Sequence, residues 1–382
     1  MSIVQKRPPG LVRDAIVSVL SESEKPMSVS EIERNVEILL GPTPRSSIRS
    51  YLRLNTPGLF AKDQRGVYFW NASPLARKTE PDPATSRAWS EPFREGNAMI
   101  YHQECIEWLR SRKKHSIHAV VTDPPYGLHE YSSDQIAKLR TGKGGVWRIP
   151  PSFDGSTRAP LPRFTTLTAK QLDDLSIFFF DWAKSLLPVL VPGANVVVAS
   201  NPLLSYLISN SLATAGLERR GEIVRLTMTM RGGDRPKNAH DEFQDVSVMP
   251  RSMWEPWLIF RKPLEGRVQD NLRKWKTGGF RRISGKRPFG DVIVSSPTRK
   301  QERDLAPHPS LKPQAFLRQI VRASLPLGAG IVLDPFAGAG STLAAALAVG
   351  YESIGIERDE KYFLVAKLSI PKLAKLHISE VV

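Results

Sequence analysis

The segment Asp123-Pro124-Pro125-Tyr126 follows the apolar run 119–122 and combines a carboxylate, two prolines and an aromatic ring. The run indicates a buried strand, so the motif would lie at the carboxyl end of a strand, where open α/β sheets bind ligands. The Asp123 carboxylate and the Pro124 carbonyl can each accept one N–H of an exocyclic amino group, which localises the nitrogen lone pair for attack on carbon. Tyr126 can stack on the ring that carries the amine. The four residues are therefore the catalytic candidates.

A second candidate site is the glycine-containing run D-P-F-A-G-A-G-S-T at 334–342, between an apolar strand-like segment and an alanine-rich helical one. Gly338 and Gly340 let the backbone approach a ligand at a helix N-terminus, where free N–H groups can meet a carboxylate. Leu343 stands where a dinucleotide fingerprint needs its third glycine, which weakens a pyrophosphate interpretation. Glu357, at the end of the next strand-like run, could accept hydrogen bonds from a ribose diol. A ligand with an amino acid end and an adenosine end fits both features.

These motifs need a sheet to position them. From residue 98 onward, short apolar runs alternate with helical stretches, which is typical of a parallel sheet covered by helices. We expect a doubly wound α/β fold in which the two motifs meet at one edge. The strands that we predict are 119–122, 195–200, 257–260, 331–333 and 353–356.

Two long segments interrupt this alternation. Residues 131–168 are rich in glycine and proline with few apolar groups, and we predict a mobile loop. Residues 218–305 hold 20 Lys+Arg against 12 Asp+Glu, interleaved with tryptophan and phenylalanine, which suits contact with phosphates and bases. A solvated basic surface with core tryptophans is the alternative. The DNA-binding candidates in this segment are Arg273, Lys274, Lys276, Arg281 and Arg282.

Residues 1–72 have the pattern of three helices followed by a short hairpin. Ser28 or Ser30 could cap the second helix, and the third helix carries Arg49 on its polar side. This is the element order of a winged helix, and the sequence resembles the HARE-HTH family of winged-helix modules. Such a module docks a helix in the major groove when it binds DNA, so Arg49 is a further DNA-binding candidate, although winged helices that bind only protein fit equally. Residues 73–92, rich in proline and polar groups, are predicted to be a linker.

The composition limits the class of protein. The 382 residues carry a net charge of +16, which favours a polyanionic partner such as double-stranded DNA. No apolar run reaches the roughly 18 residues of a membrane span, and the N-terminus lacks the apolar core of a secretory signal. Cys105 is the only cysteine, and no His/Cys/Asp cluster accompanies His308, so we expect no metal site. His308 itself is expected to fix its loop by hydrogen bonding. A cytoplasmic, DNA-associated location of bacterial or phage type follows.

Four motifs together carry a resemblance to a known family. They are D-P-P-Y at 123–126, H-P-x-L-K-P at 308–313, D-P-F-A-G-A-G-S-T at 334–342 and G-I-E at 355–357. Their types and order resemble the DNA amino-methyltransferases of the β arrangement, over about residues 94–375. The resemblance implies a Rossmann-like methyltransferase domain over 93–382, with 218–305 as its target-recognition insert.

The resemblance also implies S-adenosylmethionine as the cofactor. Lys312 would help to line the methionine end. The remaining cofactor-binding candidates are Asp334, Phe336, Gly338, Gly340, Ser341, Thr342 and Glu357. This chain has Ala339-Gly340-Ser341-Thr342 where members of the family commonly have Ser-Gly-Thr-Thr.

The function expected from these features is site-specific methylation of adenine N6 in duplex DNA, by base flipping and direct in-line transfer. Cytosine N4 is the alternative target, followed by RNA or protein glutamine. A regulator that only binds DNA would be expected to have lost Asp123 or the glycine loop, and both are present. No second carboxylate/lysine motif supports a nuclease. The recognition sequence, the role beside a restriction enzyme and the choice between monomer and homodimer stay open.

Overall fold

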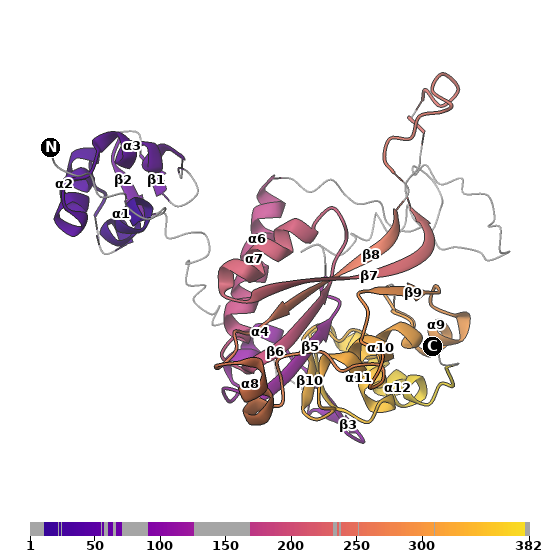
Figure 1. The fold of residues 1–382 in the computed structure, drawn as a ribbon. Helices are drawn as coiled ribbons and strands as arrows, with labels where there is room; N and C mark the ends of the chain where they lie inside the picture. Colours follow the sequence, from indigo (N-terminus) through magenta and orange to yellow (C-terminus); the bar gives the residue numbers. More distant parts are fainter. Residues whose placement is uncertain are drawn as a thin grey trace. The chain divides into compact units, whose positions relative to one another are not determined.

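The computed structural model describes residues 11–21, 23, 25–54, 56, 60–63, 66–70, 91–125, 169–231, 235–236, 238–250, 252–308 and 310–378. The predicted loop 131–168, most of the predicted linker and Tyr126 lie outside these ranges. The chain divides into two compact units, Met1–Ser86 and Arg87–Val382, and each is described by itself (Figure 1).

The N-terminal unit packs three helices against a short antiparallel hairpin. The Ser28 hydroxyl oxygen accepts the Glu31 N–H at the start of the second helix, and the Glu31 carboxylate accepts the Ser28 N–H, so the cap is a capping box. Ile16, Ile32 and Ile48, one from each helix, are fully buried together. The elements are α1 (Leu11–Ser21), α2 (Val29–Leu40), α3 (Arg45–Leu54), β1 (Phe60–Lys62) and β2 (Tyr68–Trp70). This element order matches a winged helix, whose contact with DNA stays a prediction.

The second unit is built on a nine-stranded mixed sheet within the described residues. Its order is β3-β4-β11-β10-β5-β6-β8-β7-β9. Strands β4, β11, β10, β5 and β6 run parallel, whereas β8 is antiparallel to both β6 and β7. The bounds are β3 (Phe93–Glu95), β4 (Ala98–His102), β5 (Ile117–Thr122), β6 (Leu190–Ala199), β7 (Glu218–Arg231), β8 (Ser252–Arg261), β9 (Val292–Ser295), β10 (Ile331–Asp334) and β11 (Glu352–Glu357). Each predicted strand coincides with one of these.

Helices cover both faces of the sheet, which explains why its central strands are apolar on both sides (Figure 1). Along β5, Val120 faces one helical layer while Ala119 and Val121 face the other. The first layer comprises α4 (Cys105–Arg110), α6 (Ala169–Leu186) and α7 (Ser205–Ala215), and the second comprises α10 (Gln314–Ser324), α11 (Ser341–Ala348) and α12 (Glu360–Ala374). The short helices α8 (Val268–Trp275) and α9 (Lys300–Leu305) complete the unit. The architecture is the doubly wound α/β fold.

The segment 218–305, predicted to be a target-recognition insert that holds the strand 257–260, contributes more of the sheet than that strand. Its first half forms β7 and β8, two long strands of the sheet itself, and β9 also comes from it. Charged residues in these strands neutralise each other across the ladder, because Arg225 faces Glu255 and Glu218 faces Arg261. Strands β7 and β9 were thus not predicted from this basic segment, whereas the core of β8 was, and the role of the segment in target recognition stays a prediction.

Candidate active site

A hydrogen bond joins the ends of the two strands that carry the sequence motifs. The Thr122 hydroxyl, at the end of β5, donates to Asp334 Oδ1, at the end of β10, over 2.6 Å. The two strands are parallel neighbours, so the residues that follow them emerge at the same edge of the sheet. Asp123 and the glycine loop are thus brought together from positions far apart in the sequence.

Asp334 is a buried carboxylate that organises the glycine loop. Besides Thr122, the Phe336 N–H donates to its Oδ1 over 3.1 Å, and the Thr342 side chain also hydrogen-bonds to it. Burial raises the pKa of Asp334 to about 6 despite these donors, and the nearby negative charge of Asp123 adds to the rise. The loop is therefore tied at both of its ends to one side chain.

The glycine loop holds two residues in the left-handed region, Gly338 at φ +51° and Gly340 at φ +78°. The Gly338 N–H donates to Glu357 Oε2 over 2.8 Å, which ties the loop to the end of β11. Helix α11 then begins without a side-chain cap at Gly340. Its first N–H groups are thus available to an acceptor from a ligand.

Phe336 places an aromatic wall beside the loop. Its ring lies 5.6 Å from that of Trp182 and 5.9 Å from that of Phe178, measured between centroids, and both partners belong to α6. The ring is only partly buried, and Phe336 lines the pocket between the two motifs. This wall offers a flat apolar surface to a planar ligand.

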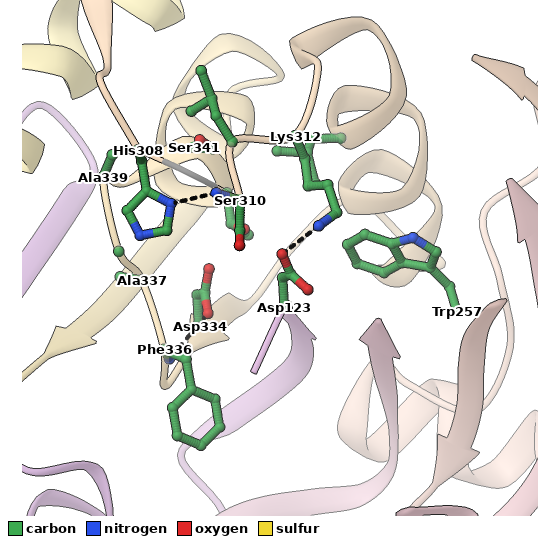
Figure 2. Close-up of a pocket in the computed structure, with 14 residues that line it drawn as sticks. Asp123, Trp257, His308, Ser310, Lys312, Asp334, Phe336, Ala337, Ala339 and Ser341 are labelled. Atoms are coloured by element: carbon green, nitrogen blue, oxygen red, sulfur yellow. Dashed lines mark hydrogen bonds and ion pairs between the residues drawn. The ribbon is translucent and has the colours of Figure 1, made fainter. Parts of the chain in front are cut away.

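Figure 2 shows the pocket between the motifs. Asp123 stands at its centre, and the ammonium of Lys312 is paired with its Oδ2 atom. The pocket is lined by Asp123, Trp257, His308, Ser310, Leu311, Lys312, Leu317, Asp334, Phe336, Ala337, Gly338, Ala339, Ser341 and Thr342. Of the residues predicted to bind cofactor, Gly340 and Glu357 are not in this lining, and Glu357 acts on it through Gly338.

Lys312 lines the same pocket as the glycine loop, and its charged end pairs with carboxylates. It contacts Asp123 and, over 3.2 Å, Glu255 Oε1, so it acts on the residue expected to hold the target amine. Its predicted place at the methionine end of the cofactor stays a prediction. Burial alone would lower the pKa of Lys312, but attraction to Asp123 and Glu255 outweighs it and raises that pKa.

Next to Lys312, Arg225 and Glu255 form an ion pair that was not predicted from the sequence. Arg225 Nη1 lies 2.6 Å from Glu255 Oε2, and Arg225 Nε also donates to Ser295 Oγ over 3.0 Å. Burial would raise the pKa of Glu255, but Lys312 and Arg225 together lower it, so the carboxylate stays ionised. Charges therefore alternate along Asp123, Lys312, Glu255 and Arg225.

His308 lines the same pocket as a neutral ring. Its Nδ1 accepts the Ser310 N–H over 3.2 Å, and its ring meets Tyr362 edge-on at 4.5 Å. Burial, followed by the charge of Lys312, lowers the pKa of His308 to about 4. The ring holds its loop in place, as expected from the sequence.

The prolines of the catalytic motif follow β5 directly. Pro124 is buried and Pro125 is exposed, while Asp123 is half-buried between the strand and the pocket. Tyr126 lies outside the described residues, so its stacking role stays a prediction. Of the predicted catalytic set, the structure thus places Asp123, Pro124 and Pro125 at the pocket edge of the sheet.

The predicted DNA-binding cations of the segment 218–305 lie near the amino ends of the parallel strands, opposite the carboxyl ends where Asp123 lies. Asn271 in α8 donates to the Pro192 carbonyl near the start of β6, and Trp275 meets His115, which precedes β5. Arg281 donates to the Tyr351 hydroxyl just before β11. Arg273, Lys274, Lys276, Arg281 and Arg282 therefore sit near the amino ends of the parallel strands, away from Asp123. Arg273 and Lys274 are also paired with Asp270 and Glu265.

Arg49 belongs to the N-terminal unit. Its Nε lies 2.8 Å from Glu33 Oε1, and its side chain is 63% exposed. The pairing leaves most of the guanidinium open to solvent, so contact with DNA stays a prediction.

Two negative findings concern the described residues alone. None of their helices is long and apolar enough to cross a membrane. They also contain no group of three or more His, Cys, Asp or Glu side chains arranged to hold a metal ion.

Comparison with known proteins places these motifs in a family. A family model described as DNA methylase matches residues 117–368. The chain is 37% identical to the Type II methyltransferase M2.LlaDCHI of Lactococcus lactis subsp. cremoris, over 73% of this chain and 91% of that protein. It is 23% identical to the Type II methyltransferase M.HindIII of Haemophilus influenzae, over 72% and 96% respectively.

A solved structure also resembles the chain. The M1.HpyAVI–SAM complex is 18% identical, with a TM-score of 0.43, and the match covers 71% of this chain and 98% of that one. The matched residues contain β5, β8 and β10, the strands that carry or directly precede the pocket residues Asp123, Trp257 and Asp334. The chain belongs to the N6/N4 DNA methylase family, whose members use S-adenosylmethionine to methylate N6 of adenine or N4 of cytosine in DNA.

Proposed function

We propose that this methylase modifies adenine at N6 in duplex DNA, within a short recognition sequence. The observation that carries the proposal is the position of Asp123, half-buried at the end of β5 and facing the pocket that the glycine loop borders. In the family that the motifs resemble, aspartate at the first position of D-P-P-Y goes more often with adenine, and serine with cytosine. The relatives' names support a modification role beside a Type II restriction enzyme.

The residues of the glycine loop fit the cofactor. Gly338 and Gly340 adopt positive φ values that favour glycine, and the uncapped start of α11 can receive a carboxylate. Both Glu357 oxygens accept backbone N–H groups, from Gly338 and Asp359, and each keeps a lone pair that a ribose hydroxyl can use. Bound there, S-adenosylmethionine supplies a methyl group made electrophilic by positively charged sulfur.

The chain's own groups prepare the amine. Asp123 accepts one N–H and the Pro124 carbonyl accepts the other, which concentrates the nitrogen lone pair on the side that faces the cofactor. Since proline has no N–H, the backbone at Pro124 and Pro125 offers no donor that would compete for the carboxylate. The ammonium of Lys312 pairs with Asp123, so a positive charge lies beside the carboxylate that is proposed to accept the N–H.

The target base must leave the duplex to reach this pocket. Extrusion costs a few kcal/mol, which stacking and hydrogen bonds to the base edge offset. Trp257 forms a buried wall of the pocket beside Asp123 (Figure 2), and Tyr126 is the predicted stacking partner. Positioning and electrostatics then supply the acceleration, without a covalent enzyme intermediate.

Mass spectrometry of nucleosides tests the target. Duplex DNA of mixed sequence is incubated with the purified protein and isotopically labelled cofactor, then digested to nucleosides. We expect labelled N6-methyladenine. Labelled N4-methylcytosine without N6-methyladenine would refute the adenine assignment, while leaving the family and the fold in place.

A further inference from the structure

Lys312 is shared between two carboxylates at the centre of the site. Its ammonium pairs with Asp123 Oδ2 and lies 3.2 Å from Glu255 Oε1. The side chains of Lys312 and Asp123 are 13% and 16% exposed, and those of Glu255 and Arg225 are 19% and 7% exposed. Four partly or fully buried groups of alternating charge therefore interact with little screening by water.

The second carboxylate is itself held by the sheet. Arg225 on β7 and Glu255 on β8 are direct cross-strand partners, and Arg225 is fixed further by Ser295 on β9 and by the ring of Phe316, 5.0 Å away. The amine acceptor at the end of β5 is thus connected, through Lys312, to three strands on the far side of the sheet. Nothing in the transfer reaction itself requires Glu255 or Arg225 to touch the substrate.

We propose that Glu255 and Arg225 are positioning residues that set how tightly Lys312 holds the Asp123 carboxylate. The inference rests on the proposed role of Asp123 as acceptor of the amine. Lys312 and the target amine donate to the same carboxylate, so they compete for its lone pairs. Glu255 gives Lys312 a second partner, which allows the ammonium to shift toward β8 when the amine binds. Arg225 limits that shift by taking part of the charge of Glu255.

The two positioning residues therefore act in opposite directions. Without the charge of Glu255, Lys312 has Asp123 as its remaining carboxylate partner, and it competes more strongly with the amine. Without Arg225, Glu255 attracts Lys312 more strongly and Asp123 loses part of its ion pair. Among the described residues, Asp334, at the end of β10, and His308, which is neutral, line the same pocket as Asp123. Both are unchanged in these variants.

The experiment measures the single-turnover rate of methyl transfer against pH, with saturating enzyme and cofactor. We expect Glu255→Gln to lower the plateau of the pH–rate profile about tenfold. It should also move the acid limb of that profile to lower pH by about 0.5 to 1 unit. Arg225→Gln is expected to move the acid limb to higher pH, and Glu255→Asp to recover much of the lost rate. Affinities for DNA and cofactor should stay within about twofold of the native values.

Glu218→Gln is the matched control. Glu218 and Arg261 form the same kind of cross-strand pair on β7 and β8, 2.6 Å apart, but at the other end of the ladder. It should reproduce any general loss of stability and leave the rate profile unchanged. If Glu255→Gln behaves like Glu218→Gln, or if the Glu255 and Arg225 variants shift the acid limb in the same direction, the inference is wrong.

The Lys312→Met variant tests whether Glu255 acts on Asp123 through Lys312 or directly. In the Lys312→Met protein, adding Glu255→Gln should not lower the rate of methyl transfer further, and a further tenfold loss would overturn the inference. If Lys312→Met alone abolishes turnover, the test rests on the opposite shifts of the acid limb that Glu255→Gln and Arg225→Gln cause in the native protein. Asp123→Asn is measured alongside. An active Asp123→Asn protein would overturn the proposed function, whereas an inactive one with a normal Glu255→Gln profile would overturn the present inference alone.

Discussion

Thr122 donates a hydrogen bond of 2.6 Å to Asp334, which connects the strand that presents Asp123 to the strand that presents the glycine loop. Both partners are buried, so the bond is costly to break. It holds two strand ends side by side: one carries Asp123, the proposed acceptor of the amine, and the other carries the glycine loop, which is proposed to bind the cofactor.

Asp123→Asn should abolish catalysis without removing cofactor binding. The amide keeps the shape of the side chain but loses its charge, and one of its oxygens is replaced by a donor. We expect the single-turnover rate to fall by about 10²- to 10³-fold. Calorimetric titration should find cofactor affinity near the native value, because Asp123 acts on the amine.

Asp270→Asn is the control for that change. Asp270 pairs with Arg267 and Arg273 on the surface at the opposite edge of the sheet. Its substitution should leave both rate and affinity as they are. An Asp123→Asn protein that retains native turnover would contradict the role of the carboxylate.

Gly338→Ala should weaken cofactor binding through steric contact as well as backbone strain. A Cβ atom at this position would lie 2.9 Å from Nε2 of His308, and the φ of +51° disfavours any side chain. Gly350→Ala serves as the control, since Gly350 has φ +78° but no atom within 4 Å of the added carbon.

Both glycine variants should lose about 1 to 2 kcal/mol of unfolding free energy in urea from the positive φ. Gly338→Ala alone should reduce cofactor affinity in calorimetric titration, because His308 must move within the pocket. Equal affinities in the two variants would show that the loop does not approach the ligand.

Asp334 should make the fold less stable as the pH rises from about 4 to about 6. Burial raises its folded-state pKa to about 6 from an ordinary value near 3.8, so the folded chain binds more protons than the unfolded chain in this window. Stability that depends on the protonated carboxyl is therefore present below pH 4 and lost as the group ionises. The full loss corresponds to about 3 kcal/mol.

Asp334→Asn isolates this contribution, since the amide stays neutral at every pH and its oxygen can still accept from Thr122 and Phe336. The unfolding free energy of the variant, relative to native, should rise by about 2 kcal/mol between pH 4.5 and 7.5, the remaining ~1 kcal/mol having been gained below pH 4.5. All other ionisable groups are common to the two proteins. A difference that does not vary with pH would mean that Asp334 ionises normally in the fold.

The sequence was sufficient to predict that the site lies at the carboxyl ends of the strands. Buried parallel strands are apolar on both faces, so a charged residue directly after such a run stands out. Asp123, Asp334 and Glu357 each follow such a run, and all three end neighbouring strands. Local composition was sufficient there, since each signal lies within about ten residues of the group that it predicts.

Arg225 and Glu255 could not be predicted in the same way. Each looks like an exposed charge in a basic stretch, and only the register of β7 against β8 makes them partners beside Lys312. The spacing of H-P-x-L-K-P placed Lys312 near the pocket, but its direction depends on these long-range contacts. The count of charges in residues 218–305 shows that this segment is basic. It carries no information on whether the cations lie near the carboxyl ends or the amino ends of the parallel strands.

The geometry changes what we expect of the cations in this segment. DNA must approach the carboxyl edge, where Asp123 lies, whereas Lys274 and Lys276 lie at the amino edge. Replacing these two lysines with glutamine should leave the slope of log K against log salt unchanged. Arg299 and Lys300, exposed at the start of α9, follow β9 at the carboxyl edge.

Replacing Arg299 and Lys300 with glutamine should reduce that slope by about 0.9 for each phosphate that the protein no longer neutralises. The comparison holds the change of charge constant, at two cations in each variant, so only position differs. Fluorescence anisotropy of a labelled duplex, titrated over roughly 50 to 200 mM salt, gives the slopes. A flatter slope for the Lys274/Lys276 variant, with no change for the Arg299/Lys300 variant, would mean that DNA reaches the amino edge of the sheet, and the base would then have no direct path to Asp123.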